Sequence, residues 1–155
     1  MTNILISGGT LPDGVKSDLL IKDGLIVEIA KKIDAQNAHV INAANSIVLP
    51  GLVDLHTHLR EPGKEDAETV ESGSRAGVKG GFTALSAMAN TSPVADTAGV
   101  VEQVFRLGQS SGLLDVFPIG AVTQGLKGEH LAEIGAMADS VARVRIFSDD
   151  GNCVF

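Results

Sequence analysis

The stretch LPGLVDLHTHLREPG, residues 49–63, decides how this chain folds. Its first part, GLVDLHTHL, is a nearly continuous apolar run, which is typical of a strand buried on both faces of a parallel sheet. His56, His58 and Arg60 follow at alternate positions where this strand gives way to a loop. Because side chains two residues apart on a strand point the same way, we expect both imidazoles to face one side.

Two neutral imidazoles on one face form a chelating pair for Zn²⁺ or a similar metal. A lone buried histidine is more often satisfied by hydrogen bonds in a core, but a pair at this spacing beside an arginine favours metal ligation. The planar guanidinium of Arg60 suits bidentate binding of a carboxylate. The alternative is that Arg60 pairs with its neighbours Glu61 or Glu65.

Strand-like and helix-like segments alternate after this stretch. Helical spacing is found over 66–81, 96–112 and 130–140, and extended runs over 81–90, 113–122 and 141–150. We expect Asp96 to be the N-cap of the second helix. Alternation at this spacing predicts parallel βα units with right-handed crossovers, four strands and three helices in all.

Residues 1–50 have a different rhythm. Short runs alternate apolar and polar residues and are separated by Gly, Asp and Asn, and KDG at 22–24 is typical of a turn between two strands. We therefore predict a small antiparallel β unit, a sheet or sandwich, over 1–50, followed by the βα units over 51–155.

Polar side chains collect at the C-terminal ends of the predicted strands. They are His56, His58 and Arg60 after the first, Asn90 after the second, Thr123 or Gln124 after the third, and Asp149 and Asp150 after the fourth. Barrel enzymes gather catalytic side chains at this rim, whereas an open sheet concentrates them at one switch point. The distribution favours the first part of a (β/α)8 barrel.

Two further assignments depend on this rim. One of Asp149 and Asp150 would complete the metal site, and the other suits a turn before Gly151. Asn90 can donate and accept hydrogen bonds, so with Arg60 it predicts a clamp for a small anionic substrate. The alternative for Asn90 is a simple turn residue.

Composition excludes several classes of function. A net charge of −7 and the absence of Trp and Tyr argue against nucleic-acid binding. The single Cys153 excludes an internal disulfide. No charged-then-apolar leader opens the chain and no apolar run reaches about 18 residues, so we expect a cytoplasmic protein with no membrane partner.

The motifs DLHTHLREPG, MANTSP and FSDDG together resemble the dihydroorotase family of the amidohydrolase superfamily, in its bacterial single-function class. The resemblance covers essentially the whole chain and implies an α/β fold, the N-terminal part of a (β/α)8 barrel with about four βα units behind a small β unit. It implies His56 and His58 as metal ligands for one or two Zn²⁺ ions. Asp150 matches the metal-binding carboxylate, with Asp149 as the close alternative.

The resemblance also implies a substrate site and a reaction. His58, Arg60 and Asn90 match substrate-binding positions, the last two holding the carboxylate. The family reaction interconverts N-carbamoyl-L-aspartate and (S)-dihydroorotate in pyrimidine biosynthesis, with a metal-bound hydroxide as nucleophile.

The family's catalytic aspartate and further histidine ligands lie on later strands, so no catalytic residue is assigned here. We expect a truncated N-terminal portion that is inactive alone, with a homo-oligomer or a partner chain supplying the rest of the barrel. Two alternatives remain open: another cyclic amide hydrolase, such as a hydantoinase or allantoinase, and a non-catalytic dihydroorotase-like subunit.

Overall fold

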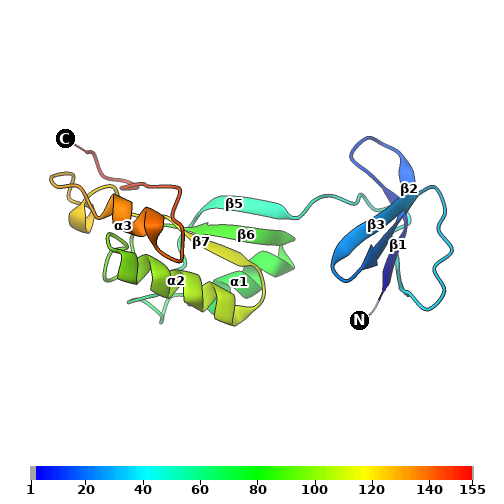
Figure 1. Ribbon diagram of the computed structural model, residues 1–155, viewed down its shortest axis with the longest axis horizontal. Helices are drawn as coiled ribbons and strands as arrows, with labels where there is room; N and C mark the ends of the chain where they lie inside the picture. Colours follow the sequence, from blue (N-terminus) through cyan, green and yellow to red (C-terminus); the bar gives the residue numbers. More distant parts are fainter. Residues whose placement is uncertain (1–2, 155) are drawn as a thin grey trace. The chain divides into compact units, whose positions relative to one another are not determined.

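The computed structural model describes residues 3–154. The chain divides into two compact units between Pro50 and Gly51, called here the N-terminal unit and the βα unit (Figure 1). The N-terminal unit contains β1 (Ile4–Thr10), β2 (Lys16–Lys22), β3 (Leu25–Ala30) and β4 (His39–Asn42). The βα unit contains β5 (Leu52–Thr57), α1 (Val70–Lys79), β6 (Phe82–Ala87), α2 (Ala98–Ser111), β7 (Asp115–Pro118), the 3-10 turn η1 (Gln124–Leu126) and α3 (Ile134–Asp139).

The N-terminal unit is a four-stranded sheet in the order β3-β2-β1-β4. The turn predicted at KDG joins β2 to β3, and Asp23 and Gly24 have φ values of 51° and 78°, as a tight hairpin turn requires. The prediction of a wholly antiparallel unit is wrong, because β4 pairs with β1 in parallel. A parallel pairing needs a crossover, and Ile33 in the connecting segment packs on Leu5 and Leu20 of the sheet.

Asp18 fixes this crossover from inside the N-terminal unit. Its side chain is buried, and its carboxylate accepts hydrogen bonds from the Ile33 backbone N–H at 3.0 Å, the Gly8 backbone N–H at 2.8 Å and the Ser7 hydroxyl at 3.0 Å. The bond from Ile33, followed by those from Gly8 and Ser7, outweighs burial and lowers the pKa of Asp18 below its ordinary value. The charged form of this side chain therefore stabilises the folded unit.

The βα unit is a parallel sheet in the order β5-β6-β7, with α1 and α2 packed against one of its faces (Figure 1). The core between sheet and helices is formed by Val70, Leu85, Val104 and Val116, all buried. Helix α1 begins with a capping box between Thr69 and Ser72. The parallel βα order is the one that the hydrophobic pattern predicts.

Asp96 does not cap α2, contrary to the expectation from the sequence. The N-cap is Thr97, and the Asp96 carboxylate instead accepts a hydrogen bond from the backbone N–H of Gly125 at 2.8 Å. Helix α3 is also shorter than the predicted 130–140, because Leu131 forms an antiparallel bridge with Thr123 before the helix begins. In both places, residues that the local pattern assigns to a helix instead form a tertiary contact outside it.

The predicted fourth strand, 141–150, is not a regular strand. Its only pairing among the described residues is an isolated parallel bridge between Phe147 and Gly120. The Gly120 N–H donates to the Ile146 carbonyl, and the Ser148 N–H donates to the Gly120 carbonyl. The segment therefore lies beside the continuation of β7, but β7 ends at Pro118, which has no N–H to extend the ladder.

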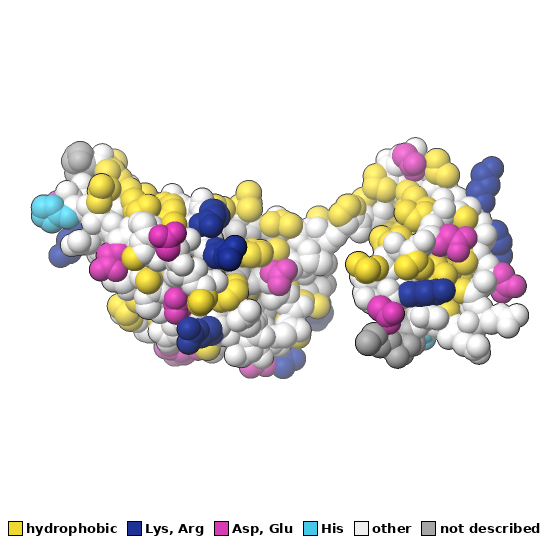
Figure 2. Space-filling model, viewed as in Figure 1, with side chains coloured by type: hydrophobic (Ala, Val, Ile, Leu, Met, Phe, Trp, Pro, Cys, Tyr) yellow, Lys and Arg dark blue, Asp and Glu magenta, His cyan; other side chains and the backbone are white. Residues whose placement is uncertain are grey.

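The second face of the βα sheet carries exposed apolar side chains. Val53 and Leu55 on β5 are 57% and 63% exposed, and Phe117 on β7 is 48% exposed. Figure 2 shows hydrophobic side chains at the surface of both units. None of the helices within residues 3–154 is long and apolar enough to span a membrane.

Candidate metal centre

His56 and His58 lie at the C-terminal end of β5, where the strand is irregular. Asp54 pairs with Leu85 and Thr57 with Ala87, so β5 carries one extra residue between these pairs. Such a bulge bends a strand and redirects its side chains. Asp54 supports the bend locally, because its carboxylate accepts the backbone N–H of His56 at 3.0 Å.

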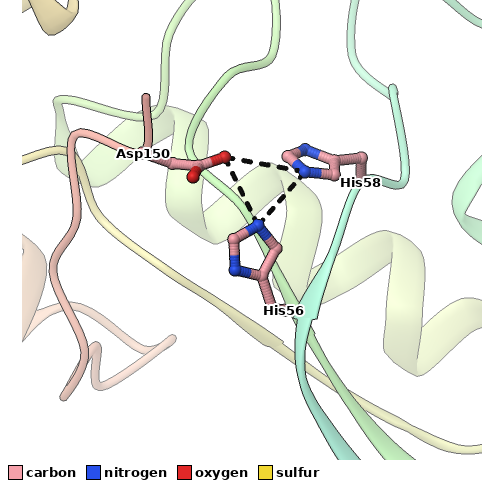
Figure 3. A group of neighbouring side chains, drawn as sticks. All are labelled: His56, His58 and Asp150. Carbon is pink, nitrogen blue, oxygen red and sulfur yellow. Dashed lines mark hydrogen bonds and ion pairs between the residues drawn. The ribbon is translucent and has the colours of Figure 1, made fainter. Parts of the chain in front are cut away.

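The two imidazoles face the same side and converge on one point. Their Nε2 atoms are 3.2 Å apart, and the rings meet edge-on with centroids 5.1 Å apart. The Asp150 carboxylate approaches the same point, with Oδ2 at 3.3 Å from Nε2 of His56 and 3.6 Å from Nε2 of His58 (Figure 3). The site therefore combines two residues from the end of one strand with one residue from a segment some ninety positions later in the sequence.

The neighbouring Asp149 points away from this site. It is 5% exposed, and one carboxylate oxygen accepts the backbone N–H groups of Val122 and Thr123 at 2.8 and 3.0 Å. Its other oxygen accepts the Thr123 hydroxyl, which in turn accepts the Gly128 N–H at 2.9 Å. Of the two candidate carboxylates, the structure brings only Asp150 to the histidines.

Arg60 follows the histidines with a positive φ of 55°. Neither of the alternative partners proposed from the sequence binds it: Glu61 accepts the Val70 N–H at 2.7 Å, and Glu65 accepts the Gly63 N–H at 2.7 Å. Within residues 3–154 its guanidinium has no ion-pair or hydrogen-bond partner. The hydrogen-bond donors of the Arg60 guanidinium therefore have no acceptor within this part of the chain.

Asn90 lies just beyond β6 and contacts one of the metal-ligand candidates, His58, directly. Its Oδ1 is 3.0 Å from Nδ1 of His58. Sequence reasoning treated Asn90 as a substrate contact and did not anticipate this bond, which joins residues 32 positions apart. Thr123 was a candidate for the rim, but its hydroxyl is buried against Asp149, while Gln124 is exposed at the start of η1.

The three converging atoms suit a divalent cation. Tetrahedral Zn²⁺ with nitrogen and oxygen ligands holds neighbouring donor atoms about 3.3–3.5 Å apart. The observed separations of 3.2, 3.3 and 3.6 Å lie within about 0.1 Å of this range. Two imidazoles and one carboxylate also leave coordination positions open, as catalytic rather than structural zinc sites do.

Comparison with known proteins identifies the family. Residues 45–154 match the Dihydro-orotase-like family. The chain is 62% identical to a dihydroorotase of Leifsonia xyli subsp. xyli over 97% of its own length and 34% of that protein. It is 59% identical to a dihydroorotase of Streptomyces coelicolor, covering 99% of this chain and 36% of that protein. The chain thus spans about a third of the length of these curated relatives.

Solved structures confirm the predicted fold class, a portion of an α/β amidohydrolase architecture with a small β unit. An L-hydantoinase from Arthrobacter aurescens matches 81% of this chain and 29% of its own, with a TM-score of 0.69 at 24% identity. A D-hydantoinase matches with a TM-score of 0.61 at 26% identity, over 79% of this chain and 28% of its own. The resemblance deduced from the motifs is also confirmed: this chain belongs to the dihydroorotase-like family.

Proposed function

We propose that this chain forms part of the active site of a metal-dependent cyclic amide hydrolase. The reaction is the reversible interconversion of N-carbamoyl-L-aspartate and (S)-dihydroorotate in pyrimidine biosynthesis. The observation that carries the proposal is the convergence of His56, His58 and Asp150 at the strand ends. The relatives named dihydroorotase, up to 62% identical, support the choice of reaction.

His56, His58 and Asp150 would hold Zn²⁺, with one or two ions in a complete site. When bound, the ion would polarise the amide carbonyl and lower the pKa of the attacking water. The chain's own residues prepare this site by placing three donor atoms within 4.8 Å of one another. The bulge in β5 sets the direction of the imidazoles, and the buried Asp149 holds the segment that carries Asp150.

Arg60 and Asn90 would bind the substrate through its carboxylate. The guanidinium of Arg60 has no hydrogen-bond or ion-pair partner within residues 3–154 and can form two parallel hydrogen bonds to a carboxylate. The amide of Asn90 lies against His58, so a carboxylate held there would also adjoin the metal ligands. Holding the substrate ring in one orientation removes much of the entropic barrier to nucleophilic attack on its amide.

The proposal is tested with the 155-residue chain and two ligands. We expect it to bind Zn²⁺ in isothermal titration calorimetry, and the Zn²⁺-loaded chain to bind dihydroorotate more tightly than hydantoin, which lacks the carboxylate. Arg60→Met should remove this preference while Zn²⁺ binding persists. Equal binding of both ring compounds would contradict the assignment and favour a hydantoinase-like or allantoinase-like enzyme.

A non-catalytic dihydroorotase-like subunit is the second candidate. Such a subunit needs no metal, so failure of the wild-type chain to bind Zn²⁺ would favour it. We also propose a cytoplasmic location, small-molecule substrates, and a homo-oligomer or partner chain that covers the exposed sheet face around Leu55 and Phe117.

A further inference from the structure

We infer that Asn90 serves both halves of the proposed site with different atoms. Its amide oxygen orients the metal ligand His58, and its amide nitrogen is left to donate to the substrate carboxylate. The inference rests on the proposed function and adds to it a positioning role for a residue that the family resemblance assigns to substrate alone.

The hydrogen bond to His58 determines which ring nitrogen carries the proton. An amide oxygen can only accept, so Nδ1 of His58, at 3.0 Å from Oδ1 of Asn90, must be the donor. A neutral imidazole that donates from Nδ1 keeps a lone pair on Nε2. That Nε2 atom is the one that faces His56 and Asp150.

The reversed amide orientation is incompatible with metal binding. If the amide nitrogen faced His58, Nδ1 would have to accept, and the ring proton would move to Nε2. It would then point at the place where the three donor atoms converge. The orientation of the Asn90 amide and ligation through Nε2 of His58 therefore require each other.

Two hydrogen bonds anchor the backbone just before Asn90. Before it, the Met88 N–H donates to the Thr57 carbonyl at 2.8 Å. Ala89, directly before Asn90, is buried, and its carbonyl accepts the Ala95 N–H at 3.0 Å. The amide therefore has a supported position, which an outer partner of a metal ligand needs to orient it.

The amide nitrogen of Asn90 has no hydrogen-bond acceptor within the described part of the chain. Its two N–H donors lie beside the metal-ligand candidates and suit a carboxylate, as do those of Arg60. Two substitutions therefore distinguish the acceptor role of Asn90 from its donor role. Asn90→Asp keeps the oxygen but loses the donors and repels an anion, whereas Asn90→Leu keeps the volume and loses both roles.

The first measurement is the tautomer of His58, read from long-range ¹H–¹⁵N NMR correlations at mildly alkaline pH without metal. We expect the Nδ1–H form in the wild-type chain and in Asn90→Asp. In Asn90→Leu the ring should revert to the mixture of free imidazole, in which Nε2–H dominates. The same mixture in the wild-type chain would overturn the inference.

The second measurement is Zn²⁺ affinity by chelator competition. We expect Asn90→Leu to bind about 10- to 100-fold more weakly, the usual effect of losing the outer partner of a ligating histidine. Asn90→Asp should bind Zn²⁺ at least as tightly as wild type, yet lose dihydroorotate. Gln103→Leu, which removes an exposed amide from α2, is the matched control and should change neither affinity.

The outcomes separate the two proposals. A wild-type chain that binds no Zn²⁺ contradicts the proposed function. A wild-type chain that binds Zn²⁺ with an affinity equal to that of Asn90→Leu contradicts the positioning role alone. If Asn90→Asp retains dihydroorotate, the donor role is wrong. Asn90→Ala repeats the comparison should Asn90→Leu fail to fold.

Discussion

At the scale of single residues, Asp149 and Asp150 are adjacent carboxylates with opposite surroundings. Asp149 accepts two backbone N–H groups and the Thr123 hydroxyl in the interior, while Asp150 is half-buried beside two imidazoles. The same substitution at the two positions should therefore have different consequences.

We predict that Asp150→Asn weakens Zn²⁺ binding with little change in stability, because it replaces a charged metal ligand by a neutral amide near the surface. Asp149→Asn should lower the free energy of unfolding by about 1–3 kcal/mol, because buried groups lose charged hydrogen-bond acceptors. Urea unfolding and chelator competition on both variants check this. Stability losses of equal size would contradict the division of roles.

Asp18 makes the stability of the N-terminal unit depend on pH. Its pKa is lowered in the folded state, so the folded form binds a proton less readily than the unfolded form. The stabilisation is fully present above the ordinary aspartate range, near pH 4 and higher, and is lost as pH falls through the lowered pKa.

We therefore predict that the free energy of unfolding of the N-terminal unit falls on acidification below about pH 4. Asp18→Asn should be less stable than wild type by about 1–3 kcal/mol at neutral pH and should show less loss on acidification. NMR-monitored urea unfolding, followed at Leu5 and Ile33, measures both quantities. Parallel pH profiles for the two chains would show that Asp18 is not the group responsible.

At the scale of elements, Gly120 joins the end of β7 to the segment that carries Asp150. A Cβ atom at this position would lie 2.8 Å from two ring atoms of Phe147 and 3.0 Å from the sulfur of Met137. Its backbone bridge to Phe147 depends on that close approach. The absence of a side chain at Gly120 therefore allows the segment that carries Asp150 to lie beside the end of β7.

We predict that Gly120→Ala destabilises the βα unit by about 1–3 kcal/mol, the usual cost of overpacking, and weakens Zn²⁺ binding by displacing the Asp150 segment. The matched control is Gly135→Ala in α3, where an added Cβ meets no atom within 4 Å and alanine favours the helix. Thermal unfolding and Zn²⁺ titration distinguish the two. A Gly120→Ala chain with wild-type Zn²⁺ affinity would contradict the coupling.

At the scale of the whole molecule, the βα sheet has one uncovered apolar face and an open edge at β5. Leu55 and Phe117 are exposed on that face, and among residues 3–154 β5 pairs on one side only, with β6. Unpaired strand edges and contiguous apolar surface promote association.

We predict that the 155-residue chain associates with increasing concentration in light scattering coupled to size-exclusion chromatography. The double variant Leu55→Lys and Phe117→Lys should shift the distribution toward the monomer, because it places charge on the uncovered face. A matched double change at exposed apolar positions of the N-terminal unit, Leu25→Lys and Val27→Lys, tests whether that unit contributes. A wild-type chain that stays monomeric throughout would show that the face needs no cover.

Much of the fold followed from local patterns in the sequence. Apolar periodicity predicted β5, β6, β7 and the helices between them, and the KDG turn predicted the hairpin of β2 and β3. The order His56, His58, Arg60 at a strand end indicated a metal and carboxylate site, and the motifs indicated the family. These features depend on spacing, turn chemistry and side-chain type, all of which are present within a few residues of chain.

Only the tertiary structure decided the remaining points. The parallel pairing of β4, the capping of α2 by Thr97 and the irregular course of 141–150 each depend on contacts with distant residues. The same holds for the direction of Asp150 and for the bond between Asn90 and His58. Local alternation shows that adjacent carboxylates point apart, but which of them meets the histidines depends on how Asp149 is buried against Thr123, and no local pattern encodes that contact.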